Sequence, residues 1–532
     1  MNSRKLLEEG RRDELWMKHC GYFTLSLEEF AEIQGRLLME QINLLGRSKI
    51  GKMLMGEDVP RSIEEFRQNI PLTIYADYEK HFQERNEDIL PIKPFVWART
   101  SGRTSVKGPK WIPYTKAMYD HLGDLTVGAM LMSSCSYPGD VKLERDDKFL
   151  LATAPPPYVS AYVSRSAKEQ LDVKFLPSLE EGEKMEYGQR VALGFRLAMR
   201  DGLDYFMGLA SVLARMGEQF EQQSNSTKPS KELLDPFTIW RLLKAVIVAK
   251  LRRRNILPKD IWKLKGIMTG GADTEIYGDK IQYYWGKKPL QGFGCTEGGN
   301  IAMQGWNKKG MVFSPDIVFL EFIPMEEHLK NKTDPTYKPK TVLYNELNLG
   351  IFELVLTNFH GGVLTRYRIG DLFEVISIGD EELGSPLPQL KFYSRADDVI
   401  DLGGLVRLTE RDIWRAIETT GMKYQDWTAR KEFNSKDPIL HIYLEPKPSE
   451  NRTCEEFIRL LDLQLSSLMP DYHDLKQILG QNPLQATFLK PGSFETYMRI
   501  KQQEGADLAH IKPPHMQPSD QIMDQLQKPL LN

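Results

Sequence analysis

The chain has 532 residues, of which 41% are hydrophobic and 27% charged, a composition typical of a globular protein with more than one domain. Its 70 Lys and Arg against 73 Asp and Glu give a net charge of −3, which argues against a general nucleic-acid binder. The longest apolar run, residues 245–249, is too short to span a membrane, and the first twenty residues lack the apolar core of a secretory signal. The four cysteines lie far apart in the chain, which fits a reduced compartment, so we expect a cytoplasmic protein.

The first 70 residues are predicted to be helical. Apolar side chains recur at helical spacing over residues 25–45, and Ser62 stands where a helix cap is expected. Residues 95–100 then predict a short strand that enters a polar loop. A long helix is predicted to start at Pro236 and to end before Pro258, with a solvated basic terminus.

The middle of the chain alternates strands, helices and glycine turns, which indicates an α/β architecture. A strand starting at residue 264 is expected to break at a Gly-Gly pair, and a second strand to run into another glycine-rich turn. The expected elements are a helix over 274–285 and strands within 264–270, 289–295, 316–324, 350–358 and 363–376.

The segment 392–413 is predicted to be a boundary, with a helix beginning near Glu410. Beyond it, strands and a helix within 439–492 predict a small α+β domain, and the tail from about Pro513 is expected to be poorly ordered. We therefore predict an α/β fold with a large N-terminal domain of helix-flanked β-sheets, residues 1–395, and a small C-terminal α+β domain, residues 396–532.

The loop "ARTSGRTSVKGPKWIPYT", residues 98–115, has the composition of an anion-binding loop. Its hydroxyls and backbone N–H groups suit phosphate oxygens, and its lysines add positive charge. Lys107 precedes Gly108, so the order differs from the nucleotide loop G-x-x-x-x-G-K-[ST] of kinases and GTPases. Taken alone the stretch is a weak signal, because glycine- and serine-rich segments are usually only turns.

Further motifs follow this loop in the order found in adenylate-forming enzymes, the superfamily of acyl-CoA synthetases, luciferases and peptide-synthetase adenylation domains. They are "TSG.TS..GPK" at 100–110, "GGA" at 270–272, "GFGCTEG" at 292–298, "GD" at 370–371 and "SRADDVIDLGG" at 394–404. The chain resembles one branch more closely, the Gretchen Hagen family of acyl acid-amido synthetases. The segments that carry this resemblance are 70–82, 319–324, 346–375 and 489–514, and the third of these is the most specific.

The resemblance implies that ATP activates a carboxylic acid as an acyl-adenylate with release of pyrophosphate. The acyl group would then pass to an amine such as an amino acid, giving an amide and AMP. Two alternatives stay open: coenzyme A as a thiol acceptor, and a catalytically silent nucleotide-binding scaffold. We expect the acyl pocket around residues 150–163 and near Trp306.

The resemblance also implies roles for individual residues. Glu297 would bind Mg²⁺ and Thr296 would hydrogen-bond the α-phosphate of ATP. Asp371 would accept hydrogen bonds from the ribose hydroxyls, and Arg395 would contact ribose or phosphate. The phosphate loop would contribute Thr100, Ser101, Gly102, Thr104, Ser105 and Lys107, and the adenine pocket Gly270, Gly271, Ala272 and Phe293.

The C-terminal domain is expected to turn between the two half-reactions. Asp401 falls where the superfamily has its hinge, and Lys512 matches the lysine that approaches the α-phosphate during adenylation. Lys110 is left open between a phosphate contact and a solvent-exposed position. Arg366 and Arg368, expected two apart on a strand, are left out of the site as candidate members of structural ion pairs.

Overall fold

The computed structural model describes residues 2–100, 109–223, 235–270, 274–402, 406–434, 437–479, 482–504, 511 and 514–527. The chain divides into two compact units. The first comprises residues 1–369 and 373–392, and the second comprises 370–372 and 393–532. Residues 370–372 and 393–395, which the sequence prediction assigned to the first domain, thus group with the second unit.

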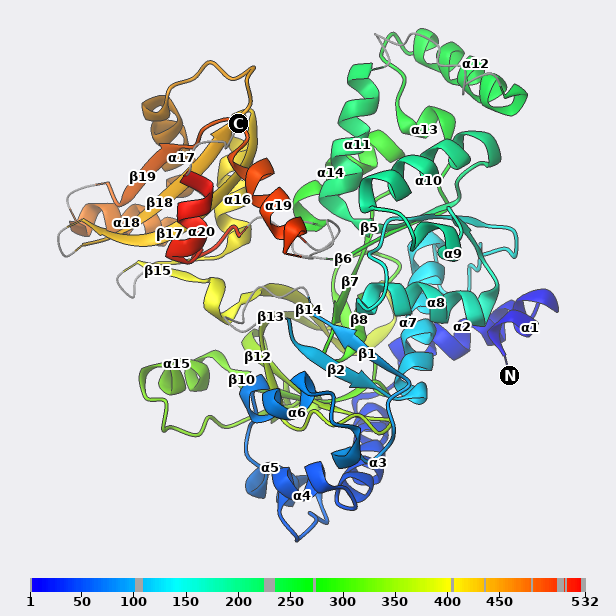
Figure 1. The fold of residues 1–532 in the computed structure, drawn as a ribbon, viewed down its shortest axis with the longest axis vertical. Coiled ribbons are helices and arrows are strands. Elements are labelled where there is room, and N and C mark those ends of the chain that lie inside the picture. The colour runs from blue at the N-terminus through cyan, green and yellow to red at the C-terminus, as the bar shows by residue number, and fades with distance from the viewer. Residues whose placement is uncertain are drawn as a thin grey trace. The chain divides into compact units, whose positions relative to one another are not determined.

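A mixed sheet of twelve strands forms the backbone of the first unit, in the order β11-β10-β12-β13-β14-β9-β8-β7-β6-β5-β3-β4 (Figure 1). Strands β3 to β7 pair in parallel, and β7 to β9 continue the sheet antiparallel. A separate hairpin of β1 and β2 stands beside it. The strands are β1 (Val96–Arg99), β2 (Trp111–Tyr114), β3 (Lys148–Leu151), β4 (Lys174–Leu176), β5 (Tyr205–Leu209), β6 (Gly266–Gly270), β7 (Leu290–Cys295), β8 (Gly299–Gln304), β9 (Met311–Phe313), β10 (Val318–Pro324), β11 (Val342–Leu343), β12 (Gly350–Asn358), β13 (Tyr367–Asp380) and β14 (Ser385–Arg395).

Helices connect the parallel strands and cover the sheet, as parallel crossovers require (Figure 1). Those of the first unit are α1 (Ser3–Glu8), α2 (Arg12–Cys20), α3 (Leu27–Leu45), α4 (Lys49–Met55), α5 (Ile63–Asn69), α6 (Glu79–Gln83), α7 (Lys116–Ser134), α8 (Val159–Leu171), α9 (Leu179–Gly182), α10 (Tyr187–Asp201), α11 (Ala210–Gln223), α12 (Pro236–Leu251), α13 (Pro258–Ile261), α14 (Thr274–Trp285) and α15 (Met325–Thr333). No described helix is long and apolar enough to cross a membrane.

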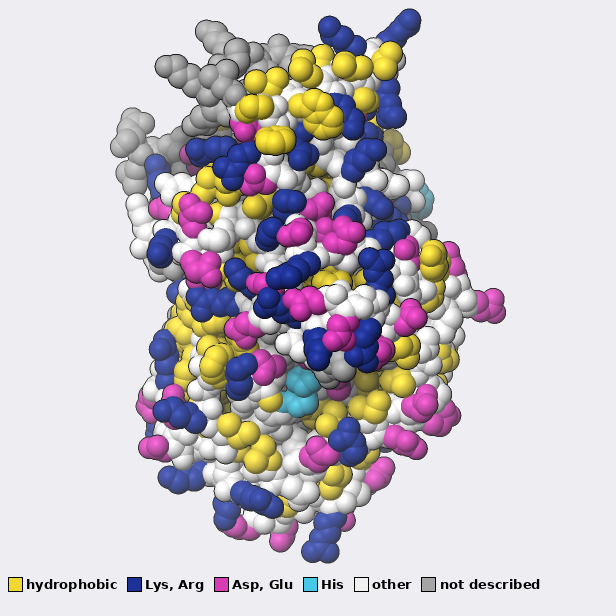
Figure 2. Space-filling model, turned by 90° about the vertical axis from the view of Figure 1, so that its right-hand side faces the viewer, with side chains coloured by type: hydrophobic (Ala, Val, Ile, Leu, Met, Phe, Trp, Pro, Cys, Tyr) yellow, Lys and Arg dark blue, Asp and Glu magenta, His cyan; other side chains and the backbone are white. Residues whose placement is uncertain are grey.

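Helix α12 begins at Pro236, as predicted, and Asp235 caps it by accepting a hydrogen bond from the Thr238 backbone N–H. Hydrophobic side chains gather with Lys and Arg at the top of the face drawn in Figure 2, where Figure 1 shows this helix. The basic terminus is only partly solvated, because Arg254 donates to both carboxylate oxygens of Asp260 at 2.6 and 2.8 Å.

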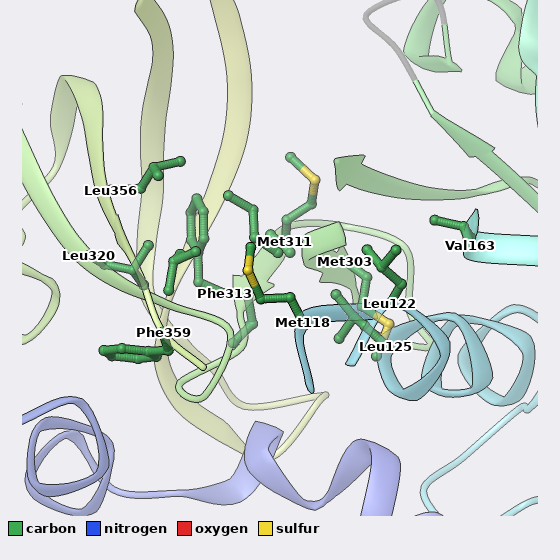
Figure 3. Close-up of a cluster of buried hydrophobic side chains, with 14 of the residues drawn as sticks. Met118, Leu122, Leu125, Val163, Met303, Met311, Phe313, Leu320, Leu356 and Phe359 are labelled. Atoms are coloured by element: carbon green, nitrogen blue, oxygen red, sulfur yellow. The ribbon is translucent and has the colours of Figure 1, made fainter. Parts of the chain in front are cut away.

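Helix α7 is a central core helix of the first unit, 19 residues long, and the sequence analysis did not predict it. Its Met118, Leu122 and Leu125 point toward Met303 and Phe313 of the sheet (Figure 3). All five side chains are buried. The helix therefore fixes the position of β8 and of the turn that precedes it.

The N-terminal helix α3 packs against β10 of the sheet through polar as well as apolar contacts. Ser26 and Glu29 form the capping box of α3, which spans the helix predicted at 25–45. The buried Gln34 amide donates to the Val318 backbone oxygen at 2.9 Å and accepts from the Leu320 N–H at 2.9 Å. These bonds satisfy backbone groups at the start of β10 and hold α3 against the sheet.

The second unit contains a three-stranded sheet in the order β17-β18-β19 and a two-stranded pair, β15 and β16. Its helix α16 begins at Glu410, as predicted, with Thr409 as N-cap. The elements are β15 (Ile400–Leu402), β16 (Val406–Leu408), α16 (Glu410–Thr419), β17 (Tyr424–Asn434), β18 (Asp437–Pro446), α17 (Cys454–Leu468), α18 (Pro470–Leu479), β19 (Leu484–Phe488), α19 (Ser493–Gln503) and α20 (Asp520–Gln527).

The prediction of a poorly ordered tail is wrong for the described residues after 513. Residues 520–527 form α20, whose Met523 and Leu526 are buried. His515 is buried, stacks on Trp427 with ring centroids 4.4 Å apart, and bonds to Asp426 at 2.7 Å and Glu410 at 2.5 Å. Burial lowers the pKa of an imidazole, but the two carboxylates outweigh it and raise the pKa of His515 to about 9.

Candidate functional site

The predicted phosphate loop connects β1 and β2, two antiparallel strands that are hydrogen-bonded to each other. Strands β1 and β2 pair antiparallel, with Arg99 opposite Trp111. At their ends the Thr100 N–H donates to the Lys110 backbone oxygen at 2.9 Å, and the Lys110 N–H donates to Thr100 Oγ1 at 3.1 Å. Ser101, Gly102, Thr104, Ser105 and Lys107 lie outside the described residues, so the structure defines the base of this loop.

The turn after β7 presents a buried carboxylate. Thr296 and Glu297 follow the carboxyl end of β7, and Glu297 is 8% exposed. The backbone of the turn is anchored by two donors: Tyr114 Oη bonds to the Thr296 carbonyl at 2.8 Å, and Asn358 Nδ2 to the Glu297 carbonyl at 2.9 Å. These two bonds fix the main chain from which the Glu297 side chain projects.

The turn requires glycine at position 299. Its φ is +78°, a region that other residues rarely adopt, and a Cβ placed there would lie 2.5 Å from Leu122 Cδ2 of α7. The close approach of α7 to the start of β8 therefore depends on a bare backbone. Gly299, the residue after the motif at 292–298, thus has a structural reason to be glycine.

Lys110 and Tyr367 face the Glu297 carboxylate. Lys110 Nζ lies 3.8 Å from Glu297 Oε1 and donates to Tyr367 Oη at 3.3 Å, and Tyr367 Oη donates to Glu297 Oε1 at 3.5 Å. The Lys110 ammonium also lies 5.1 Å from the centroid of the Tyr75 ring, a cation–π geometry. The Lys110 side chain is 18% exposed, so it points into the site rather than into solvent.

Two tyrosines near this turn keep their protons well above neutral pH. Burial and then the Glu297 charge raise the pKa of Tyr367, and burial raises the pKa of Tyr114. Both phenols are therefore hydrogen-bond donors at neutral pH. The phenol protons are already donated to the Thr296 carbonyl and to Glu297, so the Lys110 ammonium is the group here that suits anionic oxygens.

Gly270 and Phe293 lie on neighbouring parallel strands. Gly270, the last residue of β6, pairs with Gly292 of β7, and a Cβ at Gly270 would meet the Gly292 oxygen at an ordinary 3.9 Å. The fold itself therefore leaves room for a side chain at this position. Phe293 is half-buried and packs edge-on against Phe373 with centroids 4.8 Å apart. Gly271 and Ala272 lie outside the described residues.

Asp371 and Arg395 belong to the second unit, on β13 and β14. Arg395 Nε lies 3.3 Å from Asp371 Oδ1, and Asp371 is 7% exposed. The structure thus brings together the two residues that the sequence linked to ribose and phosphate. Lys512 lies outside the described residues, and Asp401 lies on β15.

The two arginines that we left out of the site are indeed members of ion pairs. Arg366 donates to both oxygens of the buried Glu321 at 2.8 and 3.0 Å, and Arg368 to both oxygens of Glu353 at 2.7 and 2.9 Å. Their expected place on one strand is wrong, however. Arg366 has φ +44° and precedes β13, which starts at Tyr367, so a left-handed residue turns the chain into the strand.

The site also contains residues that our sequence prediction missed. Tyr75, Tyr114 and Tyr367 surround the Glu297 turn, and Lys110 had been left open. Tyr367 lies in the block 346–375, but a phenol inside a strand gives no sign of the direction in which it points. Among the described residues, no group of three His, Cys, Asp or Glu could hold a metal ion. Glu297 offers carboxylate oxygens, the ligand type that hard cations prefer.

The fold is that of the adenylate-forming ligases. The structure of a protein described as AtGH3.15 acyl acid amido synthetase in complex with 2,4-DB matches with a TM-score of 0.68 at 16% identity, over 97% of this chain and 95% of that one. A 2-hydroxyisobutyryl-CoA ligase in the postadenylation state matches with a TM-score of 0.54 at 14% identity, over 97% of this chain and 92% of the ligase. The predicted fold class is confirmed.

The chain belongs to the GH3 family. The N-terminal domain of that family matches residues 21–154, its central domain residues 311–395 and its C-terminal domain residues 411–521. Together the three matches span more than half of the chain. An indole-3-acetic acid-amido synthetase, GH3.3 of Arabidopsis thaliana, is 24% identical over 362 residues, and the alignment covers 63% of this chain and 57% of that relative. The resemblance stated from the motifs is therefore confirmed.

Proposed function

We propose that the protein is an ATP-dependent ligase that activates a carboxylic acid as an acyl-adenylate and transfers the acyl group to an amine. The observation that carries this proposal is the buried Glu297 carboxylate, held beside Lys110 at the base of a phosphate-type loop. It follows the carboxyl end of a parallel strand, which is where open α/β sheets bind ligands. Membership of the GH3 family and the adenylate-forming fold support the same reaction.

The reaction joins two anions, so the site has to neutralise charge and align the reactants. An oxygen of the acid attacks the α-phosphorus of ATP, the bond to the β-phosphate oxygen breaks, and pyrophosphate leaves. The amine nitrogen then attacks the acyl carbon, the bond to the AMP oxygen breaks, and the amine loses one proton. In the first step Lys110 and the loop from Thr100 to Lys107 are assigned to the phosphates, and Thr296 to the α-phosphate.

Glu297 would hold Mg²⁺, whose charge would neutralise that of the phosphates. The position fits a hard cation because the Glu297 carboxylate is buried and its backbone carbonyl is held by Asn358. Tyr367 donates to the same carboxylate and keeps it oriented. Lys110 is then assigned to the phosphate oxygens once the metal is bound.

The nucleoside is assigned to the remaining residues. Adenine would lie over the glycine backbone of Gly270 to Ala272 and against Phe293, where a side chain at Gly270 would take up space that the fold leaves free. Asp371 would accept from the ribose hydroxyls, with Arg395 as its partner. Lys512 is assigned to the α-phosphate during adenylation, and Asp401 to the hinge between the two units.

The acceptor is proposed to be an amino acid, in keeping with the amido synthetases among the relatives. The acyl pocket is proposed around residues 150–163 and near Trp306. Within this segment the Pro157 oxygen accepts a hydrogen bond from the Arg99 N–H at 2.9 Å, which ties the segment to the base of the phosphate loop. We propose a cytoplasmic location, supported by the four free cysteines.

Carboxylate-dependent exchange of labelled pyrophosphate into ATP, measured over a panel of organic acids, tests the first half-reaction. We expect exchange with at least one acid and, with an amino acid added, formation of an amide and AMP. Loss of free thiol in the presence of coenzyme A, without amide formation, would identify the thiol acceptor instead. No exchange with any acid, together with no ATP binding, would support the scaffold alternative.

Substitution of Glu297 tests the observation on which the proposal depends. Glu297→Gln keeps the shape but removes the charge, and we expect exchange to fall by on the order of 10²-fold, because about 3 kcal/mol of metal and phosphate stabilisation is lost. The exposed Glu40, paired with Arg36 on α3, gives the matched control Glu40→Gln, which should keep the wild-type rate. Equal rates in both variants would rule out the metal role of Glu297.

A further inference from the structure

Helix α12 is oriented the opposite way to an ordinary surface helix, which turns its apolar side chains to the core. Its buried residues are the small Thr238, Ala245 and Ala249. Its large apolar side chains face solvent, with exposed fractions of 69% for Phe237, 64% for Trp240, 57% for Leu243, 59% for Ile247 and 80% for Leu251.

The exposed apolar residues form a continuous row. Residues 240, 243, 247 and 251 follow one another at intervals of three and four, which places them on one face of the helix. At 3.6 residues per turn, Lys244 and Lys250 fall on the two flanks of that row. The Lys244 ammonium lies 5.4 Å from the centroid of the Trp240 ring, so charge and apolar surface adjoin.

The charge on this part of the chain has one sign. Residues 236–258 contain six Lys and Arg and no Asp or Glu, although the whole protein carries a net charge of −3. Arg254 is engaged by Asp260, whereas Lys244, Lys250, Arg252 and Arg253 are exposed. These basic residues therefore do more than mark the end of the helix, because they border the exposed apolar row.

We propose that α12 lies in the surface of an anionic lipid membrane, with the row from Trp240 to Leu251 in the acyl boundary and the flanking lysines at the headgroups. Exposed Trp and Leu bordered by Lys are the composition of interfacial helices. A second copy of the chain is disfavoured as the occupant, because two such faces would bring like charges together. The helix binds along the membrane surface.

Co-sedimentation of the full-length protein with vesicles tests this proposal. One set of vesicles contains phosphatidylcholine alone and the other contains one quarter phosphatidylglycerol. We expect the protein to bind the anionic set, more weakly as sodium chloride is raised from 0.1 to 0.5 M. Lys244→Gln/Lys250→Gln should weaken binding about 30-fold, since each cation near such a surface contributes about fivefold.

Trp240→Ser/Ile247→Ser should weaken binding at least tenfold through lost apolar contact. The matched controls are Leu349→Ser, 67% exposed, and Lys52→Gln/Lys93→Gln, whose side chains are 49% and 83% exposed. Both should bind as the wild type does, and circular dichroism should show all variants folded. No binding to the anionic set, equal binding to the neutral set, or a wild-type dimer that Trp240→Ser/Ile247→Ser dissociates would overturn the proposal.

Discussion

Arg366 lies in the segment 346–375, the most specific part of the family resemblance. Its substitution tests whether this residue stabilises the fold or takes part in catalysis. Its guanidinium donates to Glu321 at 2.8 and 3.0 Å and to the backbone oxygens of Arg67 and Ile70 at 2.6 and 2.5 Å. Arg366→Met removes all of these bonds and leaves Glu321 buried. Breaking a buried ion pair by removing one partner costs about 3 to 5 kcal/mol.

The lower end of that range applies here. Glu321 keeps a hydrogen bond from Thr341 Oγ1 at 2.7 Å and has Arg67 Nε at 3.6 Å, so its carboxylate is not left without a partner. We therefore expect a loss of about 3 kcal/mol, which lowers the melting temperature of a unit of this size by about 4 °C. Differential scanning fluorimetry measures this shift.

A second variant distinguishes two causes of the lost stability: the Glu321 charge left without Arg366, and the general loss of contacts made by Arg366. Arg366→Met/Glu321→Leu removes both charges, so we expect it to recover at least half of the lost stability. Pyrophosphate exchange, measured well below the melting temperature, should stay within about threefold of wild type in both variants. A double variant less stable than the single one, or exchange abolished in folded Arg366→Met, would refute the structural role.

Three further predictions follow from the site and the second unit. Lys110→Met should lower pyrophosphate exchange at least tenfold, because the cation beside Glu297 is lost; an unchanged rate would mean that the lysine is only a counter-ion. Asp371→Ala should raise the Kd for ATP roughly tenfold or more in calorimetric titration, since hydrogen bonds to a charged group are lost, and an unchanged Kd would contradict the ribose role. The His515 imidazolium, with a folded pKa of about 9 against an ordinary 6.5, stabilises the second unit fully below pH 6.5. Urea unfolding should show about 3 kcal/mol of stability lost between pH 6.5 and 9, and His515→Gln should remove this dependence; the same slope in the variant would contradict it.

Local patterns were sufficient for some elements of the fold. The helix at 274–285 and the strand at 350–358 are found with the bounds that their periodicity predicted, because capping residues and branched side chains act over a few neighbours. The helix from Pro236 was also predicted, but its orientation was not. Periodicity shows that a helix has an apolar face, and only the packing of Ala245 and Ala249 shows that this face is turned outward.

The sequence by itself determined the family, the fold class and the candidate role of Glu297, since these depend on the order and spacing of motifs along the chain. The tertiary structure decided which side chains surround that carboxylate. Lys110, Tyr114 and Tyr367 are separated by up to 257 residues and meet at one turn, because folding packs the β1–β2 pair against the large sheet. It also decided that His515 is a buried cation, since a pKa depends on the charges that folding brings together.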